Sequence, residues 1–244
     1  MLIKEIYDFL DELSPFSLQE KWDNSGLIVG NMEDSFSKVY ISLDLDKYIL
    51  ENIEPNSLII THHPLIFSPL KTVNYDSYST KILQQLIKND IKLISMHTNI
   101  DKSHLNKYVG SKILGFDIEC GEDFICYANV NMSLENLKLH LKEKLNLEFT
   151  KSVNCHEHIN KIALTTGAGM SLISSIDADC FLTGDIKYHD AMEAKSRNIS
   201  LIDIGHYESE HHFRALLMGL VEKYLLKNEI KAIITSSQNP FDYK

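Results

Sequence analysis

Apolar residues recur along this chain in short blocks, and their spacing predicts which blocks form helices and which form strands. In the first block, residues 2–13, apolar positions fall three or four residues apart, as in an amphipathic helix, and Ser14-Pro15 ends it. Between residues 38 and 101, short apolar runs bounded by polar turns alternate with helical stretches. They predict strands at 38–45, 57–64 and 91–101, with helices at 46–53 and 77–89. This alternation is typical of a largely parallel sheet.

The same alternation returns in the second half. It predicts strands at 161–169, 180–190, 200–210 and 231–236, with helices at 169–176, 187–197 and 209–228. The intervening stretch 116–135 is irregular, and we interpret it as a boundary or an edge hairpin. A helix is expected over 133–145, with Ser133 as its N-cap.

Two short motifs repeat between the halves. Thr61-His62-His63 ends a strand in the first half, as Thr183-Gly184-Asp185 does in the second, and a histidine four residues before an acid follows the next strand in each half. The sequence therefore predicts an α/β fold with two related, interlocked lobes and mixed, largely parallel sheets. The first lobe is expected at 1–123 plus 231–244 and the second at 124–230.

Composition and charge narrow the class of protein. The chain is 44% hydrophobic and 24% charged, which is typical of a globular protein, and its formal net charge is −10. An acidic surface argues against nucleic-acid binding, although a local basic patch would still permit it. The N-terminus lacks the pattern of a signal peptide, and apolar runs are too short for a membrane span. We expect a soluble, cytoplasmic protein with no membrane partner.

The cysteines are Cys120, Cys126, Cys155 and Cys180, and their spacing contains no CxxC pair. In the absence of a framework spacing, we interpret all four as reduced, structural thiols.

Adjacent histidines at the end of strand 57–64 are the first candidate for chemistry. Carboxyl ends of strands in an open α/β sheet are where ligands bind, and His62-His63-Pro64 stands there. Neighbouring side chains in extended backbone point to opposite faces, so the two imidazoles suit two ions side by side better than one. The alternative is a pair of capping or core histidines.

Two further motifs supply carboxylates. His97 precedes Asp101 by four residues and His206 precedes Glu210 by four, so on a helical turn each pair points to one side. With the adjacent histidines they offer more ligands than one tetrahedral zinc takes, but a suitable set for two ions bridged by a carboxylate. The donors suit zinc, iron or manganese. Alternatively, each motif is a capping histidine beside a solvated acid.

Several other residues are weaker candidates. His189 can shuttle a proton and Lys187 can meet a phosphate, or Lys187 is simply a solvated helix start. Gly167-Ala168-Gly169 can bring backbone N–H groups to an anion. Asp23-Asn24 is interpreted as a turn-forming pair. The remaining histidines are expected in solvated loops, at the surface or beside the ligands: His140, His156, His158, His211 and His212.

Five segments carry a family resemblance. They are WDNSGLIVG (22–30), THHPLIF (61–67), HTNID (97–101), TGDIKYHD (183–190) and GHYESE (205–210). In this order they resemble the Nif-three-like dinuclear metal-centre family, whose bacterial members are labelled GTP cyclohydrolase 1 type 2 homologues. The resemblance implies two divalent ions in a cleft between two α/β lobes, and a toroidal homohexamer. It also implies the ligands His62, His63, Asp101, His206 and Glu210, with Glu210 as the bridge and His97 as a helper.

These observations lead to a functional hypothesis with rivals. We expect a metal-dependent hydrolase in which a metal-bound hydroxide attacks a nucleotide or phosphorylated small molecule, with GTP the substrate implied by the resemblance. His97 or His189 acts as acid or base. The alternative is a non-catalytic metal-binding scaffold or metallochaperone that forms an oligomeric ring. A DNA-binding regulator is disfavoured by the acidic charge.

Overall fold

The chain leaves one folded unit, forms a second, and returns to the first. The structure, a computed structural model, describes residues 1–242. Met1–Ile100 and Phe213–Pro240 form the first unit. Asp101–His212 forms the second, to which Phe241 and Asp242 are also assigned.

The sheet of the first unit has the strand order β1-β4-β3-β2-β11. Its strands are β1 (Gly26–Val29), β2 (Lys38–Ser42), β3 (Leu58–Thr61), β4 (Lys92–Ser95) and β11 (Lys231–Ile234). β11, β2, β3 and β4 are parallel, and β1 pairs antiparallel with β4. The register aligns Ser42 with Thr61 and Thr61 with Ser95, so the loops after β2, β3 and β4 leave the sheet at the same edge.

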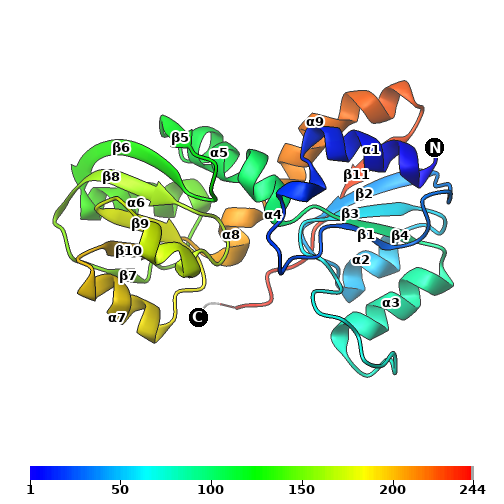
Figure 1. Cartoon of the computed structure of the whole chain (residues 1–244), viewed down its shortest axis with the longest axis horizontal. Helices are drawn as coiled ribbons and strands as arrows, with labels where there is room; N and C mark the ends of the chain where they lie inside the picture. The colour runs from blue at the N-terminus through cyan, green and yellow to red at the C-terminus, as the bar shows by residue number, and fades with distance from the viewer. Residues whose placement is uncertain (243–244) are drawn as a thin grey trace. The chain divides into compact units, whose positions relative to one another are not determined.

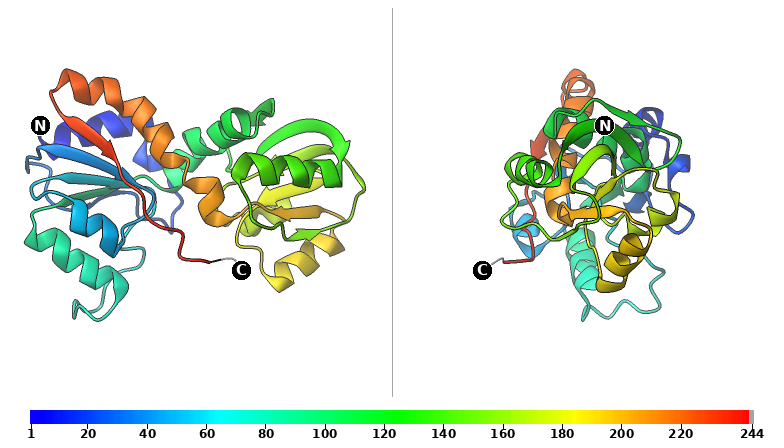
Figure 2. Two further views of the ribbon diagram at one scale, coloured as in Figure 1. Left: turned by 180° about the vertical axis from the view of Figure 1, so that it is seen from behind. Right: turned by 90° about the vertical axis from the view of Figure 1, so that its left-hand side faces the viewer.

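Helices cover both faces of this sheet (Figure 1). α2 (Lys47–Asn52) and α3 (Tyr78–Lys88) lie on one face, where they pack against Tyr40, Ile59 and Leu93. α1 (Ile3–Leu13) and α9 (Phe213–Lys227) lie on the other face, as the reverse view in Figure 2 also shows. Because side chains alternate along a strand, the central strands are buried on both faces, and this explains their continuous apolar sequence.

The sheet of the second unit has the order β5-β6-β8-β9-β10-β7. Its strands are β5 (Ile118–Cys120), β6 (Cys126–Ser133), β7 (Ser152–Val153), β8 (His158–Leu164), β9 (Cys180–Thr183) and β10 (Ser200–Asp203). β8, β9 and β10 are parallel, and β7 pairs antiparallel with β10. This arrangement repeats β2, β3 and β4 with β1 against β4, so the two units share a strand order over these elements.

Helical segments complete the second unit. They are η2 (Asp101–Leu105) and η3 (Val109–Ile113), both π-helical, with α5 (Asn106–Tyr108), α6 (Leu134–Leu145), the 3₁₀ helix η4 (Met170–Ser175), α7 (Tyr188–Ser196) and α8 (His206–Glu210). The Ser133 hydroxyl caps α6 by accepting the Asn136 N–H at 3.2 Å, as expected. Ile173 of η4 and Ala194 of α7 pack with Phe181 and Leu201 of the sheet.

The elements confirm the predicted alternation but shift several limits. β4 ends at Ser95, and a helical run starts at Thr98 with α4 (Thr98–Ile100). The helix expected over 209–228 is two helices, α8 and α9, separated at residues 211–212. The stretch 169–176 is a 3₁₀ helix, and β7 was not expected.

The compact units also differ from the expected lobes, which were 1–123 plus 231–244 and 124–230. Residues 101–123 belong to the second unit because they include β5, which pairs with β6. Residues 213–230 belong to the first because α9 packs against β2 and β11.

One expectation about the cysteines is wrong. Cys120 and Cys126 form a disulfide, while Cys155 and Cys180 are free thiols as expected. The antiparallel register of β5 and β6 places Cys120 opposite Cys126, with their Cα atoms 4.1 Å apart. Local spacing in the sequence does not reveal this pairing, because it depends on the hairpin register.

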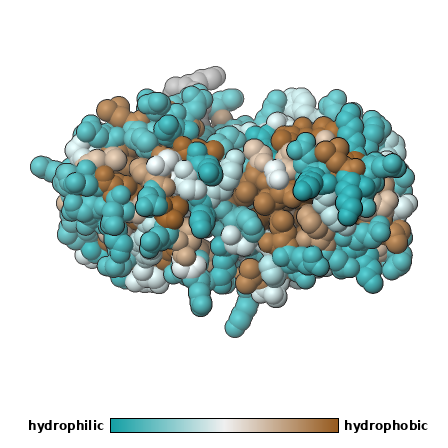
Figure 3. All heavy atoms as spheres, turned by 90° about the horizontal axis from the view of Figure 1, so that it is seen from above, coloured by the Kyte–Doolittle hydropathy of each residue, from teal (hydrophilic) through white to brown (hydrophobic). Residues whose placement is uncertain are grey.

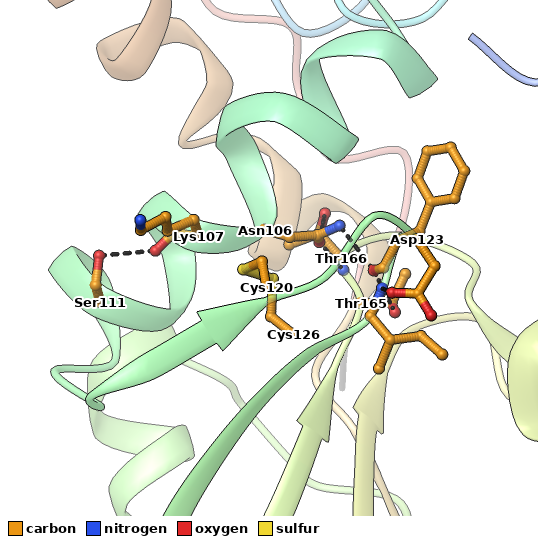
Figure 4. The surroundings of a disulfide bond; sticks show 10 residues. Asn106, Lys107, Ser111, Cys120, Asp123, Cys126, Thr165 and Thr166 are labelled. Atoms are coloured by element: carbon orange, nitrogen blue, oxygen red, sulfur yellow. Dashed lines mark hydrogen bonds between the residues drawn. A yellow bond between two sulfur atoms is a disulfide. The ribbon is translucent and has the colours of Figure 1, made fainter. Parts of the chain in front are cut away.

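The disulfide closes a loop that is bonded to two neighbouring segments (Figure 4). Within this loop, the Phe124 carbonyl accepts the Asn106 side-chain N–H and the Thr165 hydroxyl, each at 3.0 Å. Asn106 in turn accepts the Thr166 N–H at 2.8 Å and the Thr166 hydroxyl at 2.9 Å. The hairpin loop is therefore tied to α5 and to the turn after β8.

Hydrophilic residues cover most of the face drawn in Figure 3, with smaller apolar patches between them. Across residues 1–242, the helices fall short of the length and apolarity that a bilayer crossing requires.

Candidate metal centre

Three histidines meet at the carboxyl edge of the first unit's sheet, and we call them the histidine cluster. His62 and His63 follow β3 directly, and His97 follows the adjacent strand β4. Each of the three offers a ring nitrogen within 4.8 Å of the other two. The parallel pairing of β3 and β4 explains their meeting, because both loops leave the sheet at the same edge.

His62 is held rigidly in this cluster. It is fully buried, and its Nδ1 lies 2.8 Å from the Met96 carbonyl oxygen. Its ring also packs against Phe213, with centroids 5.0 Å apart. A carbonyl can only accept, so Nδ1 carries the proton and Nε2 carries the lone pair. This is the tautomer that a metal-ligating histidine requires.

Carboxylates orient the other two rings in the same way. His63 Nδ1 lies 2.8 Å from Asp44 Oδ1, and His97 Nδ1 lies 2.7 Å from Asp23 Oδ1. Asp23 also accepts the backbone N–H of Thr98 at 3.1 Å. Burial raises the pKa of Asp23, but bonding to His97 and Thr98 outweighs it and holds the pKa well below its usual value. Each imidazole thus directs Nε2 away from its acceptor.

Sequence reasoning did not select Asp44, and it interpreted Asp23 as part of a turn. The structure shows that Asp23 orients His97 from 74 residues away along the chain. The position of Asp44 in the sequence could have indicated its role. Asp44 follows β2, at the same sheet edge as the loops that carry the histidines.

A second group lies in the second unit, and we call it the carboxylate cluster: Asp101, His206 and Glu210. His206 and Glu210 lie one turn apart on α8, with Nε2 and Oε2 2.9 Å apart. His206 Nδ1 lies 2.7 Å from Asp185 Oδ2. Asp101 offers a carboxylate oxygen within 4.8 Å of one from Glu210. Glu210 is 3% exposed and Asp101 8%, so two acids share a buried environment.

Gly167 makes room for this cluster. Its φ is +61°, and a Cβ there would lie 2.0 Å from Glu210 Oε1. Its N–H donates to Ser209 Oγ at 3.1 Å, and the Gly169 N–H donates to Thr183 Oγ1 at 2.8 Å. Both amides are engaged within the unit, so neither glycine forms an open anion site. Gly167 allows close packing against Glu210, and Gly169 allows close packing against Thr165 and Thr183.

The other candidate residues lie elsewhere. His189 and Lys187 are exposed at the start of α7, and among residues 1–242 neither belongs to the histidine or carboxylate cluster. His156 Nε2 bonds the Asn198 carbonyl at 2.7 Å. His158 Nε2 bonds Asn131 Oδ1 at 2.8 Å.

The remaining histidines lie on helices or beside them. The rings of His211 and His212 pack against each other after α8 at a tilt of 37°, with centroids 4.0 Å apart. His140 was expected at the surface. It is instead half-buried, with Nε2 2.7 Å from the Leu114 carbonyl oxygen.

Both crossings between the units run next to candidate ligands. The chain passes from the first unit to the second between Ile100 and Asp101, and returns between His212 and Phe213. His97 precedes the first crossing by three residues, and Glu210 precedes the second by two. Imidazole and carboxylate donors of this kind suit zinc, iron or manganese.

These features define a class of α/β protein in which two sheets of related strand order carry histidine and carboxylate ligands at their edges. Residues 1–240 match the family model described as Duf34/NIF3 (NGG1p interacting factor 3), and the chain belongs to this family. The resemblance seen in the sequence motifs is thereby confirmed.

Sequence identity to individual proteins supports the same family assignment. The chain is 49% identical over its full length to the full-length "GTP cyclohydrolase 1 type 2 homolog" of Campylobacter jejuni. It is 44% identical over 226 residues to the "GTP cyclohydrolase 1 type 2" of Helicobacter pylori J99, covering 91% of this chain and 93% of the relative.

Solved structures agree on the fold. A crystal structure of a Staphylococcus aureus protein has a TM-score of 0.86 and 27% identity, covering 100% of this chain and 99% of that one. A Bacillus cereus protein related to NIF3 has a TM-score of 0.87 at 19% identity with the same coverage. The mixed α/β fold predicted from the sequence is confirmed.

Proposed function

We propose that this protein binds two divalent metal ions and hydrolyses a nucleotide or a phosphorylated small molecule. The observation that carries the proposal is the histidine cluster, in which three imidazoles converge and each is oriented by an acceptor at Nδ1. Metal-ligating histidines almost always donate the N–H of their other ring nitrogen to such an acceptor, and here all three rings do so where they converge.

The donor set fits two divalent ions. His62 and His63 supply neutral nitrogens, and Asp101, His206 and Glu210 supply the carboxylates and a further nitrogen. Two buried acids side by side carry negative charge that a cation would offset. We propose that these five residues would hold the ions.

Chemistry at the site follows from these donors. When bound, divalent ions act as Lewis acids that lower the pKa of water and polarise a substrate oxygen. His97 takes up a proton at Nε2, because Asp23 holds the proton at Nδ1. In hydrolysis the water oxygen joins the attacked carbon or phosphorus, and a proton goes to the leaving atom as its bond breaks. His189 is the alternative acid or base.

GTP is our first substrate candidate. The relatives from Helicobacter pylori are named GTP cyclohydrolase 1 type 2, and the chain covers more than nine-tenths of their length. A cyclohydrolase acts on a ring of the base, so the substrate would be a purine nucleotide.

Metal analysis with a substrate screen tests the proposal. Protein purified without added metal, then reconstituted, is expected to hold two equivalents of metal per chain and to turn over GTP. His63→Ala and Glu210→Ala should lose metal and activity together. The control is His156→Ala, because His156 bonds Asn198 and belongs to neither cluster. A metal content of one equivalent or less after reconstitution would contradict the dinuclear site.

The same experiment separates an enzyme from a scaffold. If metal-loaded protein turns over neither nucleotides nor phosphoesters, while Glu210→Ala abolishes binding of a partner, a metal-binding scaffold or metallochaperone is the better description. The homohexameric ring stays a prediction, which light scattering coupled to size-exclusion chromatography tests.

A further inference from the structure

Two exposed aromatic side chains border the histidine cluster. Trp22 is 58% exposed and Phe67 is 49% exposed. Their ring centroids lie 5.5 Å apart, and each lies 6.1 Å from the ring of His97. Aromatic rings of this size usually contribute to a core or an interface, so a pair left largely in solvent beside candidate ligands requires an explanation. We call Trp22 and Phe67 the aromatic wall.

Hydrogen bonds fix the wall relative to His97. Asn24 donates its side-chain N–H to the Ile66 carbonyl at 2.6 Å, which ties the turn of Trp22 to the loop of Phe67. Asp23 accepts from His97 Nδ1, and the His97 N–H donates to Ser25 Oγ at 3.2 Å. A ligand that stacks on the wall therefore meets a prearranged surface, and ordering that surface costs little on binding.

A groove continues from the wall. The loop that follows β3 borders an open surface groove of about 830 Å³, with Phe67 in its lining. This lies within the range of about 300–1,000 Å³ that small-molecule sites occupy. Its polar lining consists of hydroxyl and amide groups, one ammonium group and one carboxylate: Ser68, Lys71, Thr72, Asn74, Asp76, Ser77, Tyr78, Ser79 and Thr80. The site thus has an aromatic end at the histidines and a polar end with a lysine.

We propose that the aromatic wall binds the base of a purine nucleotide by stacking, with the ribose and phosphate along the groove towards Lys71. The inference rests on the proposed function and deepens it, since it names the part of the substrate that faces the histidines. The two rings of the wall are inclined at 46°, so a flat heteroaromatic ring stacks on one of them with its edge against the other. The hydroxyls and the ammonium group of the groove suit a phosphorylated sugar. The histidine cluster then acts on the base, and the phosphate stays remote from it.

Trp22 is the only tryptophan in the chain, so its fluorescence reports on the wall directly. Full-length, metal-reconstituted protein is titrated with guanosine monophosphate, ribose 5-phosphate and inorganic phosphate. The nucleotide is expected to quench the emission saturably, and the two ligands without a base are expected to leave it unchanged. Equal quenching by ribose 5-phosphate would overturn the proposal.

Variants test the wall by a second route. Phe67→Ala should raise the Kd for guanosine monophosphate by about tenfold or more, the effect of losing one aromatic–base stack, while metal content stays the same. Tyr188→Ala is the matched control, because Tyr188 is a 75% exposed aromatic on α7 of the second unit. An unchanged Kd in Phe67→Ala would overturn the proposal.

Three further outcomes separate this inference from others. If His63→Ala loses metal and turnover yet the nucleotide still quenches Trp22, the wall binds the base independently of the metal, as proposed. If metal-loaded protein binds the nucleotide at the wall but does not turn it over, the proposed function fails and the inference about the wall stands. If dilution alone changes Trp22 emission and nucleotide does not, a second copy of the chain covers the wall and the proposal fails.

Discussion

Replacing Gly167 by alanine tests how Glu210 is placed. At φ +61° the new Cβ would lie 2.0 Å from Glu210 Oε1, whereas ordinary contacts begin at 3.4 Å. Glu210 is 3% exposed and bonded to His206, so the carboxylate would have to move by about 1.4 Å within a packed environment. Metal–ligand distances tolerate only about 0.2 Å, so we expect Gly167→Ala to lose this ligand.

The magnitude is measurable as metal-linked stability. A metal present at 100 times its Kd stabilises the folded chain by about 2.7 kcal/mol. If the variant binds about 100-fold more weakly, the same concentration stabilises it by only about 0.4 kcal/mol. Urea unfolding of each chain, without metal and at this metal concentration, gives the two metal-linked stabilisation energies. Alanine at positive φ also costs about 1–2 kcal/mol, so metal-free stability is expected to fall as well.

Gly115→Ala is the control for that backbone cost. Gly115 lies in the same unit at φ +75°, and a Cβ there would meet nothing within 4 Å. It should lose metal-free stability but keep the full metal-linked stabilisation. If both variants keep it equally, Gly167 does not govern the position of Glu210, and the role assigned to Glu210 fails with it.

Three further predictions concern the carboxylate that orients His63, the disulfide, and the N-cap of α6. Asp44→Asn removes the carboxylate that orients His63, so metal affinity in a competition titration should fall by about 10–100-fold. Cys126→Ala opens a loop closed across a separation of 6 residues, and urea unfolding should show a loss of about 2 kcal/mol. Ser133→Ala removes the N-cap of α6 and should cost about 1 kcal/mol in the same assay.

Each of these has its own control. For Asp44→Asn the control is Asp90→Asn, which changes an exposed acid that pairs with Lys92 and should leave metal affinity intact. If both variants lose the same metal affinity, the cause is the change in net charge and not the orientation of His63. Reductant should destabilise the native chain but not Cys126→Ala, and an unaffected native chain would argue against the disulfide. Ser111→Ala removes a hydroxyl that bonds a helix carbonyl, so a loss as large as that of Ser133→Ala would contradict the capping role.

Much of the fold could be predicted from the sequence, because the local patterns of apolar residues agree with the strands and helices of the structure. Short apolar runs became β3 and β9, and the i, i+4 spacing of His206 and Glu210 became one turn of α8. Such features depend on neighbours in the chain. Proline after His63 marked the strand end for the same reason.

The remainder depends on contacts far apart in sequence. Asp23 reaches His97 only because β1 pairs with β4, and Cys120 meets Cys126 only in one hairpin register. The pattern of an amphipathic helix does not identify the sheet that the helix covers. Pattern alone therefore placed α9 in the second lobe, whereas contacts group it with the first unit. The sequence indicated Gly167 only as part of an anion-binding pattern, because the space that it leaves for Glu210 depends on a contact far away in the chain.

The return of the chain to its first unit affects the order in which the protein can fold. β11 pairs with β2, and the alignment of Lys231 with Lys38 spans nearly the whole chain. During synthesis, all strands of the second unit's sheet are made before β11. The unit that is begun first is therefore completed last. Until then the edge of β2 is open, and closing it requires a contact of very high sequence separation, which is slow to form.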